Sequence, residues 1–159
     1  MKSLAAKVGE QLLRRGEMLA TAESCTGGLI AKRITDIAGS SGWFECGLVT
    51  YSNRAKQLFL GVRDNLLVRE GAVSEAAVRA MVKGLLRNSG ADWGIAVTGI
   101  AGPGGGSPDK PVGTVWLGLM QRSATAEAFC LHLNGNRKQI REQTAKIALT
   151  ELLARLTHA

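Results

Sequence analysis

The feature that most constrains the fold of this chain is a short apolar run that leads directly into a turn of small residues. Residues 18–22 read Met-Leu-Ala-Thr-Ala, which predicts a buried β-strand. Gly27 and Gly28 then predict a tight turn, and the apolar positions after them predict a helix over residues 28–37. The organising segment of the fold is therefore a strand, a turn and a helix.

A second strand, predicted over residues 43–50, completes a strand–helix–strand unit. Such crossovers place their two strands parallel and usually adjacent, about 4.8 Å apart. Ser24 follows the first strand, and residues 51–56 follow the second. If the strands are adjacent, these residues share the carboxyl edge of the sheet, where open α/β sheets hold their sites.

The remaining periodicity extends this pattern over the chain. It predicts a third strand over residues 92–98, an antiparallel hairpin over 112–120 and 124–133, and helices over 2–15, 54–60, 63–70, 74–87 and 137–156. A chain of 159 residues is expected to form one domain over 1–159. The predicted fold class is α/β, a three-layer α/β/α sandwich with a mixed, mostly parallel sheet.

Composition argues against several classes of protein. A net charge of +7 favours anionic partners, but the basic residues form no block, so nucleic-acid binding is unsupported. No apolar run approaches the roughly 20 residues of a membrane span, and the N-terminal segment does not resemble a signal peptide. The three cysteines have neither the number nor the spacing of a disulfide framework. We therefore expect a cytoplasmic protein.

Ser24 allows two interpretations. Ser24 or Thr26 caps the following helix, which is the commoner role of such residues, or Ser24 is a nucleophile. Lys56 is by default a solvated helix lysine. Beside Ser24 and shielded from water, its pKa would fall and it would accept the serine proton. Tyr51 is either a core or rim aromatic, or a hydroxyl that relays a proton or orients the lysine.

Alternative chemistries find less support. Cys25 is intrinsically the better nucleophile, but it needs a base, and the two histidines are poorly placed for this, with His132 inside a strand and His158 at the tail. Two distant histidines and scattered carboxylates offer no metal-ligand spacing. We therefore predict no metal site.

Two further features indicate a bound ligand, which at Arg137 would be an anion. The glycine-rich loop over residues 99–111 matches neither the Walker A nor the dinucleotide pattern, but its length favours a substrate loop over a plain hairpin connection. Arg137 stands in the first turn of the last helix, where its charge opposes the helix dipole unless an anion is bound. Pairing with a surface acid such as Glu142 is the alternative for Arg137, and Arg141 is the alternative ligand for such an anion.

Five collinear segments resemble one known family. They are TAESCTGG at 21–28, VTYSN at 49–53 with Lys56, GAVS at 71–74, GIAGP at 99–103 and PVGTVW at 111–116. Together they resemble the C-terminal domain of the competence/damage-inducible protein CinA, from about residue 3 to 155. The resemblance implies hydrolysis of the carboxamide of nicotinamide mononucleotide to nicotinic acid mononucleotide and ammonia, with no cofactor.

The resemblance also implies roles for particular residues. A serine nucleophile supported by a lysine and a tyrosine maps to Ser24, Lys56 and Tyr51. The family's Gly-Asp-Arg turn maps to residues 135–137, where asparagine replaces the acid. Substrate contacts are expected from Thr26, Gly27, Gly28, Asn53, Thr98, Gly99, Gly102, Gly104, Gly105 and Arg137.

The oxyanion of such a reaction needs N–H donors, and those at the start of the helix over 28–37 are the nearest in sequence to Ser24. A homo-oligomer is also expected. The rival interpretation is a catalytically silent module that binds a pyridine nucleotide or regulates a partner. Some relatives of that kind have lost the tyrosine or the arginine, and this chain keeps both.

Overall fold

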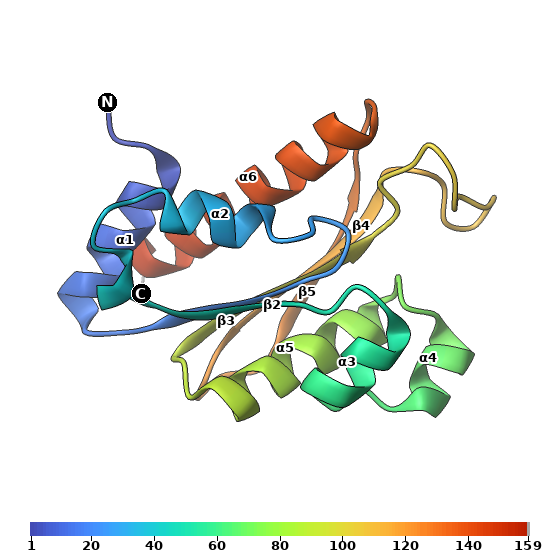
Figure 1. Cartoon of the computed structure of the whole chain (residues 1–159), viewed down its shortest axis with the longest axis horizontal. Helices are drawn as coiled ribbons and strands as arrows, with labels where there is room; N and C mark the ends of the chain where they lie inside the picture. Colours follow the sequence, from blue (N-terminus) through green and yellow to red (C-terminus); the bar gives the residue numbers. More distant parts are fainter. Residues whose placement is uncertain (159) are drawn as a thin grey trace.

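A five-stranded mixed sheet forms the middle layer of the structure, a computed structural model that describes residues 1–158 (Figure 1). β1 pairs in parallel with β2 and β3, and β4 runs antiparallel to β3 and β5. Only β4 opposes the other strands, which confirms the prediction of a mixed, mostly parallel sheet. The strand order is β2-β1-β3-β4-β5, with bounds β1 (Leu19–Glu23), β2 (Phe44–Val49), β3 (Trp93–Gly99), β4 (Thr114–Gln121) and β5 (Glu127–His132).

Helices cover both faces of this sheet (Figure 1). One layer contains α1 (Leu4–Arg15), α2 (Leu29–Thr35) and α6 (Arg137–His158), and the other contains α3 (Asn53–Leu60), α4 (Asp64–Glu70) and α5 (Glu75–Ser89). A short 3₁₀ turn, η1 (Ser40–Gly42), joins α2 to β2. The three-layer α/β/α architecture is therefore as predicted.

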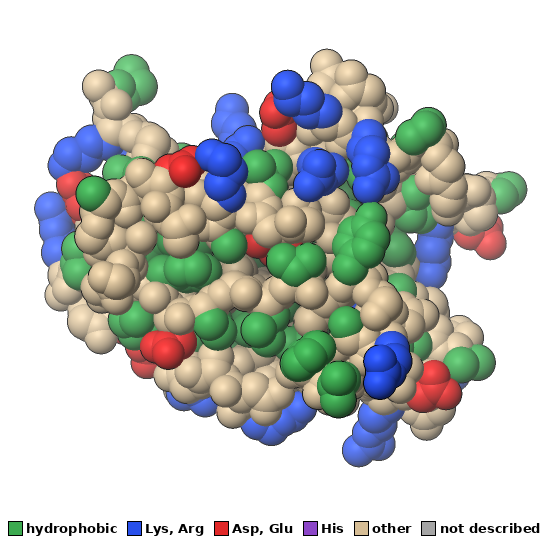
Figure 2. Space-filling model, viewed as in Figure 1, with side chains coloured by type: hydrophobic (Ala, Val, Ile, Leu, Met, Phe, Trp, Pro, Cys, Tyr) green, Lys and Arg blue, Asp and Glu red, His purple; other side chains and the backbone are tan. Residues whose placement is uncertain are grey.

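Alternation along the strands divides the core into two halves. Leu19 and Ile95 pack toward α1, α2 and α6, whereas Ala20, Ala22 and Ala96 pack toward α3, α4 and α5. The sheet face that packs against α3, α4 and α5 therefore carries small residues near its centre. Lys and Arg side chains scatter over both helical layers without a single block (Figure 2). Among residues 1–158, no helix has both the length and the apolar character needed to cross a membrane.

The predicted elements all occur, with ends that differ by a few residues. The largest difference is in the hairpin, where β5 begins at Glu127 because the chain first turns back after Gln121, whose carbonyl accepts a hydrogen bond from the Ala124 N–H at 2.9 Å. Ser74 caps α5 as predicted, since its Oγ accepts a hydrogen bond from the Ala77 N–H at 3.1 Å. Local signals therefore defined most of this fold.

The contact between α3 and α5 leaves no room for a side chain at one position. A Cβ atom added at Gly84 would lie 1.8 Å from the carbonyl oxygen of Leu60, the last residue of α3. Glycine is needed here for close approach of two backbones, and its replacement would force α3 away from α5.

We therefore expect Gly84→Ala to lower the free energy of unfolding by about 2 kcal/mol or more, the scale of an overpacked core. Gly104→Ala is the matched control, because nothing lies within 4 Å of a Cβ there. Chemical denaturation of both variants measures the effect. Equal stability of the two variants would contradict the rigid α3–α5 contact.

Candidate functional site

The end of β1 and the segment after β2 meet at one edge of the sheet. The two strands are adjacent and parallel, with Glu23 paired to Val49, so the adjacency on which the sequence prediction depended is confirmed. Ser24 directly follows β1, and its Oγ lies 3.0 Å from the Nζ of Lys56 on α3. Both side chains are buried, with exposed fractions of 8% for Ser24 and 1% for Lys56. The interpretation of Lys56 as a solvated helix lysine is therefore wrong.

The amine of Lys56 is held by two backbone carbonyls. Its Nζ donates hydrogen bonds to the carbonyl oxygens of Thr50 at 2.9 Å and Tyr51 at 3.1 Å. A neutral amine has two N–H donors and one lone pair. With both donors on these carbonyls, the third direction points at the Ser24 hydroxyl. Burial lowers the pKa of Lys56, because desolvation disfavours the ammonium form. The pair has the geometry of a nucleophile and its base.

Cys25 is not a competing nucleophile in this arrangement. Its side chain is buried, and burial raises the pKa of the Cys25 thiol to about 11. A thiol with this pKa carries almost no thiolate near neutral pH, and the thiolate is the reactive form. The preference for serine over cysteine therefore has a physical basis.

Tyr51 and Arg137 meet at the rim of the site. The Tyr51 hydroxyl accepts a hydrogen bond from Arg137 Nη2 at 3.1 Å, and Arg137 Nη1 donates to the carbonyl of Gly102 at 2.9 Å. Tyr51 is 59% exposed, so it is a rim residue. Within residues 1–158, Arg137 forms no ion pair with Glu142, which removes the alternative considered for it. The arginine instead joins the glycine-rich loop to the tyrosine.

These groups surround a cavity of about 230 Å³. Seven of the residues singled out from the sequence line it, together with Cys25 and three residues that sequence reasoning missed, Ala72, Val73 and Ala101. The full lining is Ser24, Cys25, Tyr51, Asn53, Lys56, Ala72, Val73, Thr98, Gly99, Ala101 and Arg137. Six expected substrate contacts lie outside this lining, namely Thr26, Gly27, Gly28, Gly102, Gly104 and Gly105.

Thr98 has a defined structural role at the base of this cavity. Its Oγ1 donates a hydrogen bond to the carbonyl of Ala72 at 2.9 Å. This bond ties the end of β3 to the segment between α4 and α5. The three missed residues lie in the GAVS and GIAGP segments that carry the family resemblance, but their small apolar side chains have no chemistry of their own that would indicate a role at the site.

The helix after Ser24 is capped by a residue that sequence reasoning also missed. Glu23, 1% exposed, accepts hydrogen bonds from the N–H groups of Ile30 at 2.9 Å and Ala31 at 3.0 Å, and from Thr26 Oγ1 at 2.6 Å. The prediction that Ser24 or Thr26 caps this helix is therefore wrong. An acid at the end of a buried strand was the available signal, since a buried carboxylate requires hydrogen-bond donors.

This capping also narrows the expected source of oxyanion donors, the start of the helix predicted over 28–37, where only the Gly28 N–H keeps no acceptor among residues 1–158. The first N–H groups of α2 are already engaged, with Ile30 and Ala31 bonded to Glu23 and Leu29 bonded to the carbonyl of Thr26 at 3.1 Å. These N–H groups cannot also bind an oxyanion beside Ser24. Donors must come from elsewhere in the turn.

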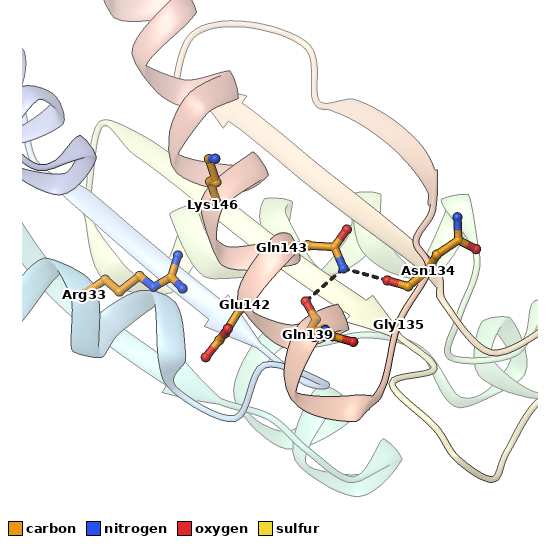
Figure 3. Close-up of a pocket in the computed structure, with 7 residues that line it drawn as sticks. All are labelled: Arg33, Asn134, Gly135, Gln139, Glu142, Gln143 and Lys146. Atoms are coloured by element: carbon orange, nitrogen blue, oxygen red, sulfur yellow. Dashed lines mark hydrogen bonds between the residues drawn. The ribbon is translucent and has the colours of Figure 1, made fainter.

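A larger cavity of about 570 Å³ lies between α2 and α6 (Figure 3). Its lining is polar, and Gln143 Nε2 donates hydrogen bonds there to the carbonyls of Asn134 at 2.8 Å and Gln139 at 3.0 Å. It contains no nucleophile beside a base. The complete lining is Arg33, Asn134, Gly135, Gln139, Glu142, Gln143 and Lys146. The smaller cavity is therefore the candidate active site, despite its size. Among residues 1–158, no cluster of three His, Cys, Asp or Glu side chains could hold a metal ion.

Comparison with known proteins places these features in a family. Residues 1–156 match the CinA C-terminal domain. The chain is 48% identical to the nicotinamide-nucleotide amidohydrolase PncC of Enterobacter agglomerans, over 96% of this chain and 93% of that protein. It is 56% identical to a CinA-like protein of Akkermansia muciniphila, but spans only 32% of that protein's length.

The solved structures agree with the sequence relatives. The structure of the competence/damage inducible protein CihA from Agrobacterium tumefaciens superposes with a TM-score of 0.93. It is 44% identical in sequence, and the match covers 97% of this chain and 93% of that one. The sheet and both helical layers are therefore those of the CinA structures.

The depressed pKa of Lys56 predicts how the reactivity of Ser24 depends on pH. A fluorophosphonate reagent should phosphonylate Ser24 faster as pH rises through the Lys56 pKa, because only the neutral amine accepts the serine proton. The rise in labelling rate should occur at a pH below the ordinary lysine pKa of about 10.4. Mass spectrometry of the labelled protein gives the rate.

Two variants test this assignment of the base. Lys56→Arg should label at least about 100-fold more slowly at every pH, since guanidinium stays charged. Cys25→Ala should label like the parent protein. Labelling of Lys56→Arg at the parent rate would remove the lysine from the chemistry.

Proposed function

This chain belongs to the CinA C-terminal domain family, and on that premise we propose that it is a nicotinamide-nucleotide amidohydrolase. It hydrolyses the carboxamide of nicotinamide mononucleotide to nicotinic acid mononucleotide and ammonia. The observation that carries the proposal is the buried pair of Ser24 Oγ and Lys56 Nζ, 3.0 Å apart at a cavity. Relatives named as amidohydrolases match nearly the whole chain, which supports the same activity.

The acylation half of the reaction uses the serine and the lysine. Ser24 Oγ attacks the amide carbon while neutral Lys56 accepts the hydroxyl proton, and the carbonyl oxygen becomes an oxyanion. When the tetrahedral intermediate collapses, Lys56 returns the proton to the departing nitrogen. Ammonia leaves, and the nicotinoyl group stays on Ser24 as an ester.

The same two residues complete the reaction with water. Lys56, neutral again, accepts a proton from water as its oxygen attacks the ester carbon. The second intermediate collapses to the carboxylic acid, which loses its proton to water, and the proton on Lys56 passes to Ser24 Oγ. The carbonyls of Thr50 and Tyr51 keep the amine oriented through both halves, because they hold its remaining N–H groups.

The size of the cavity assigns the two ends of the substrate. A volume of about 230 Å³ suits a nicotinamide ring but not a whole mononucleotide, since drug-sized ligands occupy about 300 Å³ or more. The ribose and phosphate therefore extend past the rim. Arg137 is the cation at that rim, and we assign the phosphate to it, with the backbone of Gly102, Gly104 and Gly105 alongside.

The setting of the enzyme is part of the same proposal. We place it in the cytoplasm, supported by three cysteines that form no disulfide within residues 1–158. We propose a homo-oligomer, supported by apolar side chains exposed on α3 and α4, namely Leu58, Phe59 and Val68.

Substitution of the nucleophile tests the activity directly. Ser24→Ala should release ammonia from nicotinamide mononucleotide at least about 10³-fold more slowly than the parent protein, while keeping its thermal unfolding temperature. Cys25→Ala is the matched control and should retain turnover. If the parent protein released no ammonia but bound the nucleotide, the silent binding module would be the better description. Loss of turnover in Cys25→Ala alone would reassign the nucleophile.

Removal of the rim arginine tests the assignment of the phosphate. Arg137→Ala should lower kcat/KM for the mononucleotide about 30-fold, or about 2 kcal/mol, the scale of a charge-assisted hydrogen bond. Hydrolysis of the phosphate-free riboside should change little. Steady-state ammonia release on both substrates separates a role of Arg137 in phosphate binding from a role in the reaction. Equal losses on both substrates would place Arg137 in the amide chemistry or the fold.

A further inference from the structure

A second arginine of α6 grips the turn that carries the nucleophile. Arg141 Nε donates a hydrogen bond to the carbonyl of Cys25 at 3.1 Å, and Arg141 Nη2 donates to the carbonyl of Thr26 at 2.9 Å. One guanidinium therefore holds the carbonyls of the two residues that follow Ser24. The fork of an arginine suits this task, because its donors are fixed in one plane.

The bond from Arg141 to the Cys25 carbonyl fixes the direction of the Thr26 N–H, which belongs to the same peptide group. The peptide between Cys25 and Thr26 is trans, so its N–H points opposite to its carbonyl. Because that carbonyl points at Arg141, the Thr26 N–H points away from Arg141. Within residues 1–158, this N–H has no acceptor.

The neighbouring peptide is fixed in the same way by the turn itself. The carbonyl of Ser24 accepts a hydrogen bond from the Gly27 N–H at 3.0 Å, which sets the plane that contains the Cys25 N–H. No acceptor for the Cys25 N–H lies in another described residue. Two oriented N–H groups next to Ser24 therefore have no acceptor in another described residue, although the Cys25 N–H lies against its own thiol, whereas the first N–H groups of α2 are engaged.

Free N–H groups beside a nucleophile are what an oxyanion requires. In hydrolases whose serine lies on a strand-to-helix turn, the N–H of the residue after the serine is one of the oxyanion donors. We propose that the N–H groups of Cys25 and Thr26 bind the oxyanion, and that Arg141 is the positioning residue that holds them in place. The proposal rests on the proposed function, because it takes Ser24 as the nucleophile.

The charge of Arg141 adds to its geometric effect. A guanidinium bonded to the carbonyl of a peptide polarises that peptide, which makes its N–H a stronger donor. Arg141 is half-buried, so this effect is less screened than at an exposed site. The prediction that Arg141 is the alternative phosphate ligand conflicts with this role, since two of its nitrogens already hold the turn.

Kinetic constants on two substrates distinguish these roles. Arg141→Ala should lower kcat about 10- to 100-fold with KM changed less than about 2-fold, because the oxyanion forms only in the transition state. The loss should be equal for the mononucleotide and the phosphate-free riboside. Arg141→Lys keeps one charge but cannot reach both carbonyls in one plane, and should fall between Arg141→Ala and the parent protein.

The control removes an arginine that does not touch the turn. Arg33→Ala deletes a half-buried guanidinium of α2 that makes no hydrogen bond or ion pair within residues 1–158, and it should match the parent protein. Free guanidinium ion should restore part of the activity of Arg141→Ala without changing its unfolding temperature. A KM increase confined to the mononucleotide, with kcat unchanged, would overturn the proposal and assign Arg141 to the phosphate.

A second measurement does not depend on the identity of the substrate. When a fluorophosphonate reacts, Ser24 Oγ bonds to phosphorus, fluoride leaves, Lys56 takes the serine proton, and the phosphoryl oxygen occupies the oxyanion site. Arg141→Ala should slow this labelling about 10-fold or more, and Arg33→Ala should not. If Arg141→Ala labelled at the parent rate, the positioning role would be wrong even if ammonia release is confirmed. If the labelling rates were as expected but the parent protein released no ammonia from the mononucleotide, the proposed substrate would be wrong and the role of Arg141 would stand.

Discussion

A lysine amine removed from water beside a serine hydroxyl is the interaction on which the site depends. Burial disfavours the ammonium form, and the carbonyls of Thr50 and Tyr51 satisfy two N–H groups of the neutral amine. The helix that carries it is built to place a lysine inside. Lys56 and Leu60, one turn apart, are the buried residues of α3. The lysine therefore occupies a position that periodicity would give to an apolar residue.

The other half of the site depends on alternation along β1. Ala22 faces the layer of α3, α4 and α5, and Glu23 faces α2, where its carboxylate receives N–H groups from the helix start. Ser24 follows on the side of Lys56. In this way the positive end of α2 is used to stabilise a buried acid and is not available to the reaction. The chemistry relies on the turn between strand and helix.

Sequence reasoning succeeded where the signals were local. Apolar periods defined the strands and helices, and the geometry of one crossover predicted that Ser24 and Lys56 lie at the same edge of the sheet. It failed where a role depends on a distant partner. The contact between Arg141 and the carbonyl of Thr26 joins positions 115 residues apart, and no pattern in either segment indicates it. Glu23 is a different case, because its partners lie only three to eight residues further along the chain, and an acid at the end of a buried strand was a local signal that was overlooked.

The residues proposed for chemistry and those proposed for recognition differ in depth. Ser24 and Lys56, the pair proposed to break the amide, are buried at a cavity of about 230 Å³, whereas Tyr51 and Arg137 lie at the exposed rim. A substrate longer than the cavity must cross that rim, so binding energy from its charged end is available to position the amide at Ser24. Both the rim and the turn after Ser24 are tied to α6. Arg137 contacts Tyr51 at the rim, and Arg141, one helical turn later, contacts the carbonyl of Cys25 in the turn. A displacement of this one helix, which packs against α1 and α2, would therefore disturb the proposed recognition and chemistry together.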